Sequence, residues 1–445
     1  MNRIRVRPGR RTRLGAAVTA IALALGGCGL GSGENPGAAS GPAELSGELK
    51  GTITFQTLQL KPTFTDYING VIARFEEAHP GTEINWVDIP FQGAQEKLTT
   101  DATAGTLPDV VNLNPNFAQP LEQKKLFLDL AKVAGDVKDD YVPGAWDAFK
   151  VPGADGAYGF PWYLTSEVTM YNADLFAKAG LDRDKPPTTV QELEQYAVKL
   201  AAAGRGQFYG LHPALENSFV TTLAKLGVPL LNEQGTKWTF NTPEAVRYVE
   251  QLKALYDAKA VPADSLTQDH SKEIEAYQAG KIALFPSGPN FLTIVKENAP
   301  KVAAVTKVGP QITGPGGTPN MSVMGLLVPA ASKYQKLAVE FAKFITNAEN
   351  QLAFAKIVTI LPSTTASLKD PYFTDTSDGS VESQARKISA EQIAKARNLV
   401  PLQFDDRVKK VVIGKVQLAM QGKLSAKDAL DQAVDESNQI LANNG

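Results

Sequence analysis

The chain has 445 residues, of which 43% are hydrophobic and 21% charged, and its formal net charge is −2. The hydrophobic fraction is ordinary for a globular protein, and the length is sufficient for two hydrophobic cores. Six of the 45 basic residues lie within residues 1–27, which leaves 39 basic against 47 acidic residues in the remainder, a balance of −8. An acidic remainder disfavours nucleic acid and anionic membrane as partners.

Residues 1–28 have the pattern of a bacterial export signal. The first 13 residues carry all six of these arginines and no acidic residue, and residues 14–25 carry no charge. The uncharged run is shorter than the ~20 residues that a membrane-spanning helix needs, so we expect a signal peptide over residues 1–27 that is removed. Leu25-Gly26-Gly27-Cys28 resembles the bacterial lipoprotein box, in which small residues precede a cysteine that carries lipid.

Cys28 is the only cysteine of the chain, and we predict that it is the lipidation site. The alternative is an ordinary secreted chain with a chance cysteine, but an unpaired thiol is a liability outside the cell. The pair Arg10-Arg11 leaves export by either the general or the twin-arginine route open. Residues 28–48 are rich in Gly, Ser, Ala and Pro, which predicts a flexible tether between the membrane surface and the folded part.

The part after the tether is predicted to alternate between strands and helices. Residues 52–55 and 83–87 have strand patterns, and between them apolar residues recur at intervals of three and four, as in an amphipathic helix. A helix over residues 94–104 and a strand over 109–113 follow. Strands that alternate with helices at this spacing predict wound α/β units with a mostly parallel sheet, whose ligands bind beyond the carboxyl ends of the strands.

A second wound unit is predicted from about residue 160, followed by helices. The chain shows no internal repeat. The fold class predicted from the pattern is α/β with two wound units and extra C-terminal helices. The elements expected after residue 160 are strands over 168–171 and 282–285, and helices over 173–179, 189–202, 243–259, 271–279, 333–345, 347–355, 409–420 and 425–441.

The sequence contains no recognisable catalytic motif, so no cofactor and no metal are expected. Its three histidines, His79, His212 and His270, are far apart, and beside a single cysteine they form no zinc-type cluster. Neither the nucleophile motif Gly-x-Ser-x-Gly nor the phosphate-binding motif Gly-x-x-x-x-Gly-Lys occurs. A pair of carboxylates that hydrolyses glycosides stays an alternative, although nothing selects two of the 47 acidic residues.

Five short strings occur in a fixed order between residue 50 and the C-terminus. They are Phe75-Glu76-Glu77-x-His79-Pro80-Gly81, Thr103-Ala104-Gly105-Thr106-x-Pro108-Asp109-Val110-Val111, Tyr171-Asn172-x-Asp174-Leu175-Phe176-x-Lys178-Ala179-Gly180, Phe240-Asn241-Thr242-Pro243-Glu244-Ala245-Val246 and Gln278-Ala279-Gly280-Lys281 before Ile282-Ala283-Leu284. In this order and spacing they resemble the extracellular solute-binding proteins of carbohydrate ABC importers. That family includes maltose-binding and glycerol-3-phosphate-binding proteins.

The resemblance implies a clamshell like that of periplasmic binding proteins, with two α/β lobes that close on a ligand by hinge motion. One lobe would comprise roughly residues 49–160 and 327–360, and the other residues 161–326 and 361–445, with the site between them. The chain would be a lipid-anchored monomer on the extracellular face of the cell membrane. It would not be an enzyme.

The resemblance also implies the ligand class and the partners. The protein would capture a mono- or short oligosaccharide and deliver it to the membrane subunits of an ABC importer. A ligand of the glycerol-phosphate type is the alternative within this class. From another class, a surface-attached glycoside hydrolase is the alternative.

The candidate ligand contacts lie in loops after the predicted strands and at the first crossing between the lobes. Trp162 and Tyr163 are predicted to stack on a sugar ring. Glu216 is predicted to accept hydrogen bonds from sugar hydroxyls. The amine of Lys61, with loop amides at a helix start, could instead hold a phosphoryl group, which is the basis of the glycerol-phosphate alternative. The open alternatives are hinge packing for Trp162 and a solvated surface position for Glu216 and Lys61. The full predicted set is Gln59, Lys61, Asn114, Asn116, Trp162, Tyr163, Thr165, Glu216, Ser218, Ser287, Asn290 and Met324.

Three of these positions depart from the maltose-binding relative. Asn290 stands where that relative has a stacking aromatic residue, and Asn114 and Asn116 occupy a loop that carries aromatic and acidic ligands there. Fewer aromatic rings and more amides favour a small, hydroxyl-rich ligand over a long glucan.

Overall fold

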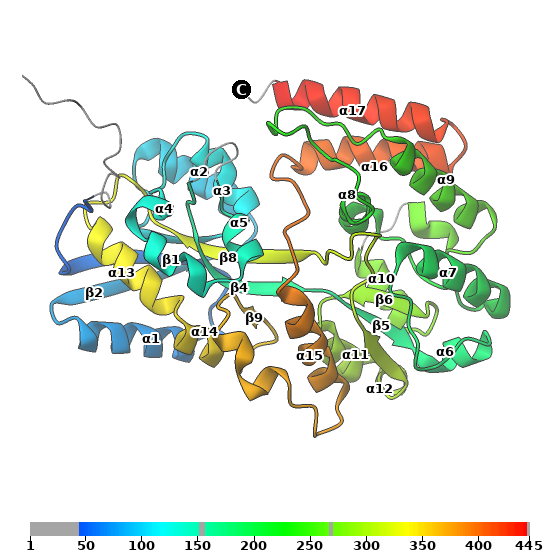
Figure 1. Ribbon diagram of the computed structural model, residues 1–445, viewed down its shortest axis with the longest axis horizontal. Helices are drawn as coiled ribbons and strands as arrows, with labels where there is room; N and C mark the ends of the chain where they lie inside the picture. The colour runs from blue at the N-terminus through cyan, green and yellow to red at the C-terminus, as the bar shows by residue number, and fades with distance from the viewer. Residues whose placement is uncertain (1–43, 151–155, 267–269, 443–445) are drawn as a thin grey trace, which may run out of the picture. The chain divides into compact units, whose positions relative to one another are not determined.

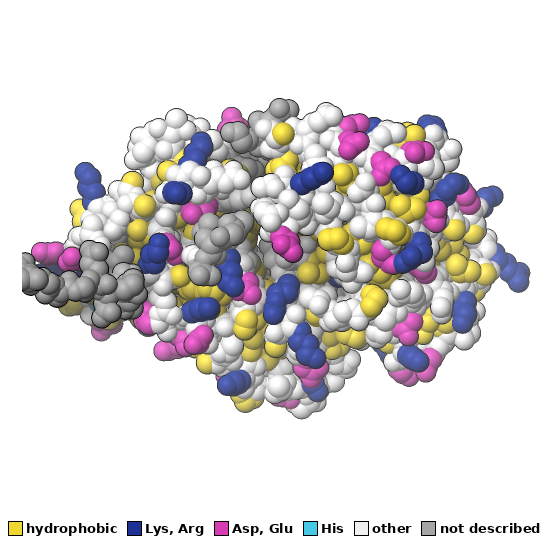
Figure 2. Space-filling model, turned by 45° about the horizontal axis from the view of Figure 1, so that its top comes forward, with side chains coloured by type: hydrophobic (Ala, Val, Ile, Leu, Met, Phe, Trp, Pro, Cys, Tyr) yellow, Lys and Arg dark blue, Asp and Glu magenta, His cyan; other side chains and the backbone are white. Residues whose placement is uncertain are grey.

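The computed structural model describes residues 44–150, 156–266 and 270–442 (Figure 1). The predicted signal peptide, Cys28 and most of the predicted tether lie outside the described residues. Within these ranges no helix is both long and apolar enough to span a membrane. On the face shown in Figure 2, acidic and basic side chains are interspersed and do not form a patch of one sign.

A six-stranded sheet forms the centre of the first lobe (Figure 1). β1 is parallel to β2 and to β3, whereas β8 is antiparallel to β3 and β4, and β9 is antiparallel to β4. Its strands, in their order across the sheet, are β2(Thr82–Ile89), β1(Gly51–Leu58), β3(Val110–Leu113), β8(Met321–Leu327), β4(Phe160–Ser166) and β9(Leu361–Pro362).

A three-stranded sheet forms the centre of the second lobe. Its order is β6(Leu284–Ser287), β5(Val168–Asn172) and β7(Thr306–Gly309), and both pairs are antiparallel. The predicted α/β class is confirmed, but the prediction of mostly parallel sheets is wrong for the described strands. Alternation of strands with helices predicts parallel neighbours, whereas β8 comes from far along the chain and inserts between β3 and β4 in the opposite direction.

Helices cover both sheets, and their ends follow local capping chemistry. Asn114 caps α3, Thr189 forms a capping box with Glu192 at α7, and Thr242 precedes the Pro243 that begins α9. In the first lobe the helices are α1(Thr65–Ala78), α2(Ala94–Ala104), α3(Pro115–Glu122), α4(Leu130–Val133), α5(Pro143–Asp147), α13(Gln335–Ile345) and α14(Ala348–Ala355). In the second lobe they are α6(Ala173–Lys178), α7(Val190–Gly204), α8(Leu215–Lys225), α9(Pro243–Asp257), α10(His270–Gln278), α11(Phe291–Asn298), α12(Pro300–Ala303), α15(Val381–Ile393), α16(Asp406–Met420) and α17(Ala426–Ala442).

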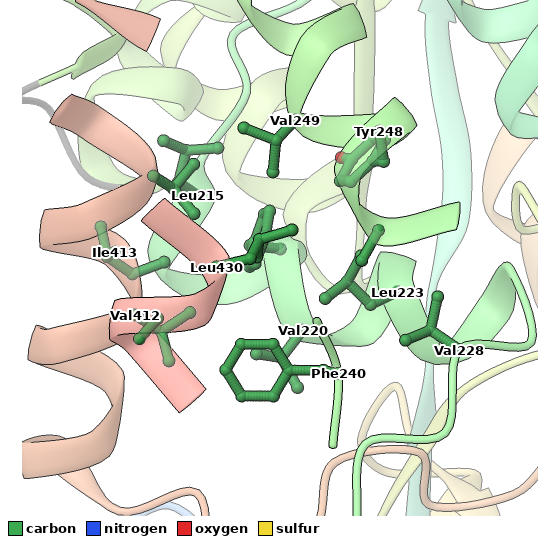
Figure 3. Close-up of a cluster of buried hydrophobic side chains, with 14 of the residues drawn as sticks. Leu215, Val220, Leu223, Val228, Phe240, Tyr248, Val249, Val412, Ile413 and Leu430 are labelled. Atoms are coloured by element: carbon green, nitrogen blue, oxygen red, sulfur yellow. The ribbon is translucent and has the colours of Figure 1, made fainter. Parts of the chain in front are cut away.

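Separate hydrophobic cores support the two lobes. In the first lobe, one cluster contains Phe55 and Phe341, and another contains Leu113 and Leu164. In the second lobe, the predicted C-terminal helices are present as α16 and α17, which pack against α8 and α9. Figure 3 shows this cluster, which includes Leu215, Val220, Leu223, Val249, Val412 and Leu430.

The chain passes between the two sheets at the end of β4, where Glu167 alone separates β4 from β5. The predicted lobe boundaries cut through β4 and β8, since both strands belong to the six-stranded sheet. At the other end of the first lobe, Ser46 in the predicted tether donates a backbone hydrogen bond to Gln335 Oε1 at 3.0 Å. The division into lobes stays a prediction at the level of individual residues.

Candidate functional site

A cavity of about 330 Å³ lies where β3 ends and where β4 and β8 leave the first lobe. It brings together five of the twelve predicted contacts. Its lining residues are Asn114, Pro115, Asn116, Tyr163, Thr165, Ser322, Val323, Met324, Asn398 and Val400. We call it the polar cavity, because amide and hydroxyl side chains predominate and none of these side chains is charged.

Two of these amides are positioned by the turn from β3 into α3. Asn114 follows the last residue of β3, and its Oδ1 accepts a hydrogen bond from the backbone N–H of Phe117 at 2.8 Å. This cap fixes the carbonyl end of the side chain and leaves its NH₂ group as a donor. Asn116 lies on the first turn of the same helix and also lines the cavity.

The opposite wall comes from paired residues of β4 and β8. Thr165 pairs with Ser322, and Tyr163 pairs with Met324. Because side chains two residues apart on a strand share a face, these two cross-strand pairs present four side chains to the same cavity. Burial raises the pKa of the Tyr163 hydroxyl well above its usual value, so it stays a neutral hydrogen-bonding group.

The structure corrects the prediction for Trp162. Its side chain is 0% exposed, and its ring contacts Phe55, Tyr163 and Phe354 at centroid distances of 5.3–6.1 Å. The strand register shifts between Pro161 and Tyr163, and Trp162 points into the core while Tyr163 borders the cavity. Trp162 is therefore a packing residue next to the crossing, and no sugar ring can stack on it in this structure.

A larger cavity of about 660 Å³ continues from the polar cavity, with which it shares Asn116 and Val400. One wall is formed by α2 and α3, and the other by α8, residues 400–409 and the end of α17. We call it the outer cavity. Glu216, in the first turn of α8, is exposed and lines it, as does Arg407, whose guanidinium forms an ion pair with Asp405 at 2.6 Å.

A third cavity, of about 230 Å³, lies in the second lobe and shares Thr221 with the outer cavity. It contains the predicted Ser218 and Ser287, and we call it the inner cavity. Lys225 and Glu167 form an ion pair at its edge, at 3.2 Å. Leucine and valine side chains contribute much of the remaining wall.

Glu194 on α7 also lines the inner cavity, and burial raises the pKa of its carboxyl to about 7. One of its carboxylate oxygens is buried without a hydrogen-bond partner among the described residues. Near neutral pH this side chain is therefore protonated in part. Within the described ranges, no three histidine or acidic side chains form a group suited to a metal ion.

Besides Trp162, three predicted residues lie outside these cavities. The ammonium group of Lys61 lies 4.2 Å from the centroid of the Trp86 ring and donates a hydrogen bond to the Trp86 carbonyl at 3.3 Å. Gln59 is exposed, with a left-handed backbone φ of 53°. Asn290 is exposed and lines a separate cavity of about 70 Å³, together with Thr165 and residues of α15.

Sequence reasoning missed Ser322 and Asn398, which line the polar cavity. The polar character of Ser322 was visible, but its place in the site depends on the pairing of β8 with β4. Asn398 lies in the segment between α15 and α16, which no local pattern marks. Both positions are set by tertiary contacts.

Comparison with known proteins identifies the family. The sequence profile described as bacterial extracellular solute-binding protein matches residues 61–352, well over half of the chain. A solved protein from Synechococcus sp. MITs9220, assigned as an oligosaccharide periplasmic-binding protein, is 33% identical with a TM-score of 0.75, and the match covers 88% of this chain and 99% of that one.

Two relatives of named ligand specificity also match. The galactooligosaccharide-binding protein of Bacillus subtilis (strain 168) is 24% identical over 378 residues, which is 83% of this chain and 85% of the relative. The sn-glycerol-3-phosphate-binding periplasmic protein of Brucella melitensis biotype 1 is 27% identical over 331 residues, 68% of this chain and 72% of the relative. The two-lobed α/β fold and the extent of the profile match lead to one conclusion: this chain belongs to the bacterial extracellular solute-binding proteins.

Proposed function

We propose that this protein binds a neutral sugar in the connected polar, outer and inner cavities and delivers it to the membrane subunits of an ABC importer. The observation that carries the proposal is the lining of the polar cavity. Asn114, Asn116, Thr165 and Ser322 supply uncharged donors and acceptors, and Tyr163 adds a half-buried ring. Sugar hydroxyls both donate and accept hydrogen bonds, so uncharged side chains of this kind suit them.

The comparisons support a carbohydrate. The Synechococcus structure is assigned to oligosaccharide binding, and the Bacillus subtilis relative binds galactooligosaccharides. These relatives are binding proteins, which favours binding without turnover over the glycoside hydrolase.

A glycerol-phosphate ligand is the second candidate, since one relative binds sn-glycerol 3-phosphate. The lysine that suggested phosphate, Lys61, is engaged with Trp86 and does not line the cavities. The polar cavity has no cationic side chain among its lining residues. These two observations favour a neutral sugar unit in the polar cavity. Basic side chains line the other two cavities, Lys124, Arg407 and Lys409 in the outer cavity and Lys225 in the inner cavity, so the ligand panel below includes a phosphate ester.

The proposal includes closure of the lobes and attachment to the membrane. A ligand that contacts both lobes stabilises the closed arrangement, and closure forms the surface that the importer recognises. Cys28 would carry the lipid, and residues 28–48 would tether the protein as a monomer at the extracellular face of the membrane. Labelling with radioactive palmitate, compared between the wild type and Cys28→Ala, tests the attachment.

Thermal unfolding in the presence of candidate ligands tests the proposed function. The panel contains galactose, glucose, their short oligosaccharides, mannitol and sn-glycerol 3-phosphate. A ligand at 100 times its Kd stabilises the folded state by about 2.7 kcal/mol. We expect saturable stabilisation by at least one neutral sugar, no stabilisation by sn-glycerol 3-phosphate and no released product.

A pair of asparagine variants locates the binding. Asn116→Ala removes an amide that lines both the polar and the outer cavity. The Kd of the stabilising sugar should rise at least tenfold, which is a loss of about 1.4 kcal/mol in binding free energy. Asn85→Ala, at an exposed position of β2, is the matched control and should not change it. Stabilisation by sn-glycerol 3-phosphate alone, or equal Kd values for the two variants, would contradict the proposal.

A further inference from the structure

The inner cavity contains a carboxyl group that is partly removed from water. Glu194 on α7 lines this cavity, and one of its carboxylate oxygens is buried without a hydrogen-bond partner among the described residues. Lys225 also lines the cavity, but its ammonium group pairs with Glu167 at 3.2 Å. Burial raises the pKa of the Glu194 carboxyl to about 7, so the folded protein exchanges a proton at this side chain near neutral pH.

The walls around Glu194 disfavour a negative charge. They are largely apolar, with side chains from Val190, Leu193, Leu211, Leu252, Leu255, Val261 and Ile312. The other charged or titratable side chains that line the cavity are Glu167 at the β4–β5 junction, His212 before α8, Lys225 on α8, Tyr248 on α9 and Glu273 on α10, with Asp264 at 4.0 Å from His212 Nε2. Two further carboxyl groups against one lysine leave the cavity acidic, and like charges favour the neutral form of a carboxyl.

The inner cavity belongs to the proposed ligand site. It shares Thr221 with the outer cavity and contains Ser218 and Ser287, two of the predicted contacts. A sugar unit that enters it displaces water from the Glu194 carboxyl. Less water destabilises the ionised carboxyl relative to the neutral one. The neutral carboxyl also offers an O–H donor and a carbonyl acceptor, the same two functions as a sugar hydroxyl.

We propose that sugar binding is coupled to the uptake of a proton by Glu194. The proton passes from the solvent to a carboxylate oxygen, and no bond of the sugar forms or breaks. The inference rests on the proposed function and adds a regulation of the same site. Because the bound state holds the proton more strongly than the free state, the affinity for sugar falls as the pH rises through 7. The protein would thus load more sugar where the surrounding medium is acidic.

Isothermal titration at two pH values tests the proposal. The probe is the member of the thermal panel, among galactose, glucose, their short oligosaccharides and mannitol, that stabilises the wild type most. If binding raises the proton affinity of this carboxyl at least tenfold, linkage predicts a Kd that is about five- to tenfold higher at pH 8 than at pH 6.

Proton exchange by the wild type gives a second test that needs no variant. The heat of binding at pH 7 is measured in PIPES and in Tris, whose ionisation enthalpies differ, and the difference gives the number of protons exchanged. We expect an uptake of about 0.4–0.5 proton per sugar bound. A buried histidine such as His212 would release a proton on losing water, so the sign of the exchange distinguishes a carboxyl from a histidine.

Two glutamate variants locate the proton. Glu194→Gln keeps the shape but cannot ionise, so its Kd should agree within about twofold at pH 6 and pH 8. Glu122→Gln is the matched control. Glu122 on α3 also has a pKa raised to about 7 by burial and an oxygen without a partner among the described residues, but it does not line the three cavities. This variant should keep the pH dependence of the wild type.

The outcomes separate this inference from the proposed function. If the wild type binds the probe with the same Kd at both pH values, or releases a proton, the inference is overturned and the proposed function stands. A pH dependence that persists in Glu194→Gln, or that Glu122→Gln also removes, overturns the inference as well. If none of the neutral compounds of the panel binds the wild type at either pH, the proposed function fails, and this inference fails with it.

Discussion

Two neighbouring aromatic residues on β4 differ in environment because the strand alternates its side chains between a core and a cavity. Trp162 is fully buried among Phe55 and Phe354, whereas Tyr163 borders the polar cavity. Trp162→Ala should therefore lower the free energy of unfolding by about 3–5 kcal/mol, through lost burial and the space left behind. Urea unfolding measures this loss.

Tyr163→Phe provides the contrast at the same strand. It removes one hydroxyl from a half-buried side chain and should change the stability by less than about 1 kcal/mol, while weakening sugar binding. A small stability loss for Trp162→Ala with a large loss of sugar affinity would return Trp162 to the site and contradict its assignment to the core.

Glu194 gives the protein a pH-dependent stability. Burial raises the pKa of its carboxyl to about 7 in the folded state, above the usual value of 4.5. The folded state therefore holds this proton more strongly than the unfolded state, and stability is lost as the pH rises from about 4.5 through 7. The effect is on the order of 1 kcal/mol, because water partly solvates the side chain.

Glu194→Gln removes the charge and keeps the shape. The variant should unfold at a higher temperature than the wild type at pH 8 and at nearly the same temperature at pH 5. Thermal unfolding at the two pH values tests this. If the unfolding temperatures of the variant and the wild type differ by the same amount at pH 5 and pH 8, the buried carboxyl is not the cause of the difference.

At the level of elements, β8 depends on a glycine where it packs against its neighbours. A Cβ atom at Gly325 would lie 2.6 Å from Phe149 Cε2 and 2.9 Å from the Phe160 carbonyl oxygen. Gly325→Ala should therefore cost about 1–3 kcal/mol, because the strand and the Phe149 ring must move apart. Gly414→Ala, on α16 and with no atom near its Cβ position, should instead stabilise by about 0.5–1 kcal/mol.

Chemical denaturation of the two glycine variants provides the comparison. The substitution is the same in both, so the sign of the change reports the local space and not the chemistry of alanine. A stabilising Gly325→Ala would contradict the packing of β8 described here.

Elements with strong local patterns could be predicted closely from sequence. The helix expected over residues 94–104 is α2(Ala94–Ala104), and that over 243–259 is α9(Pro243–Asp257), since a cap and a period of three to four define each. β4 was not expected as a strand, because it contains Pro161 and its partner β8 lies about 160 residues further along the chain.

The residues of the site show the same contrast between positions set by local sequence and positions set by contacts distant in the chain. The positions of Asn114 and Asn116 in the cavity wall could be predicted, because both lie within three residues after a strand whose carboxyl end faces the cavity. Their contact with a ligand stays a prediction. The positions of Ser322 and Asn398 could not be predicted, because strand register and the path of the segment after α15 place them. Lys61 was misleading, since its contact with Trp86 depends on the pairing of β1 with β2.

At the scale of the molecule, one side chain links the segments that pass between the sheets. Gln392 on α15 donates hydrogen bonds to Ser166 Oγ at 2.8 Å and to the Glu167 carbonyl at 2.6 Å, and it accepts one from the backbone N–H of Gln311 at 3.1 Å. These partners belong to the β4–β5 junction and to the segment between β7 and β8.

Gln392→Ala should loosen this crossing. It leaves three polar groups without their partner, and we expect a loss of about 1–3 kcal/mol in the free energy of unfolding. Amide hydrogen exchange should accelerate at Glu167 and Gln311 but not in α16 and α17, whose contacts do not involve this residue. Exchange that accelerates equally throughout the chain would mean that Gln392 acts on global stability and not on the crossing.

A neutral sugar is proposed to bind in the cavities between β3, β4, β8 and the second lobe. A crystal structure of the protein with the sugar that stabilises it most tests this directly. We expect electron density for the sugar against Asn114, Tyr163 and Thr165. Density for a specifically bound sugar elsewhere on the protein, with these side chains free of ligand, would contradict it.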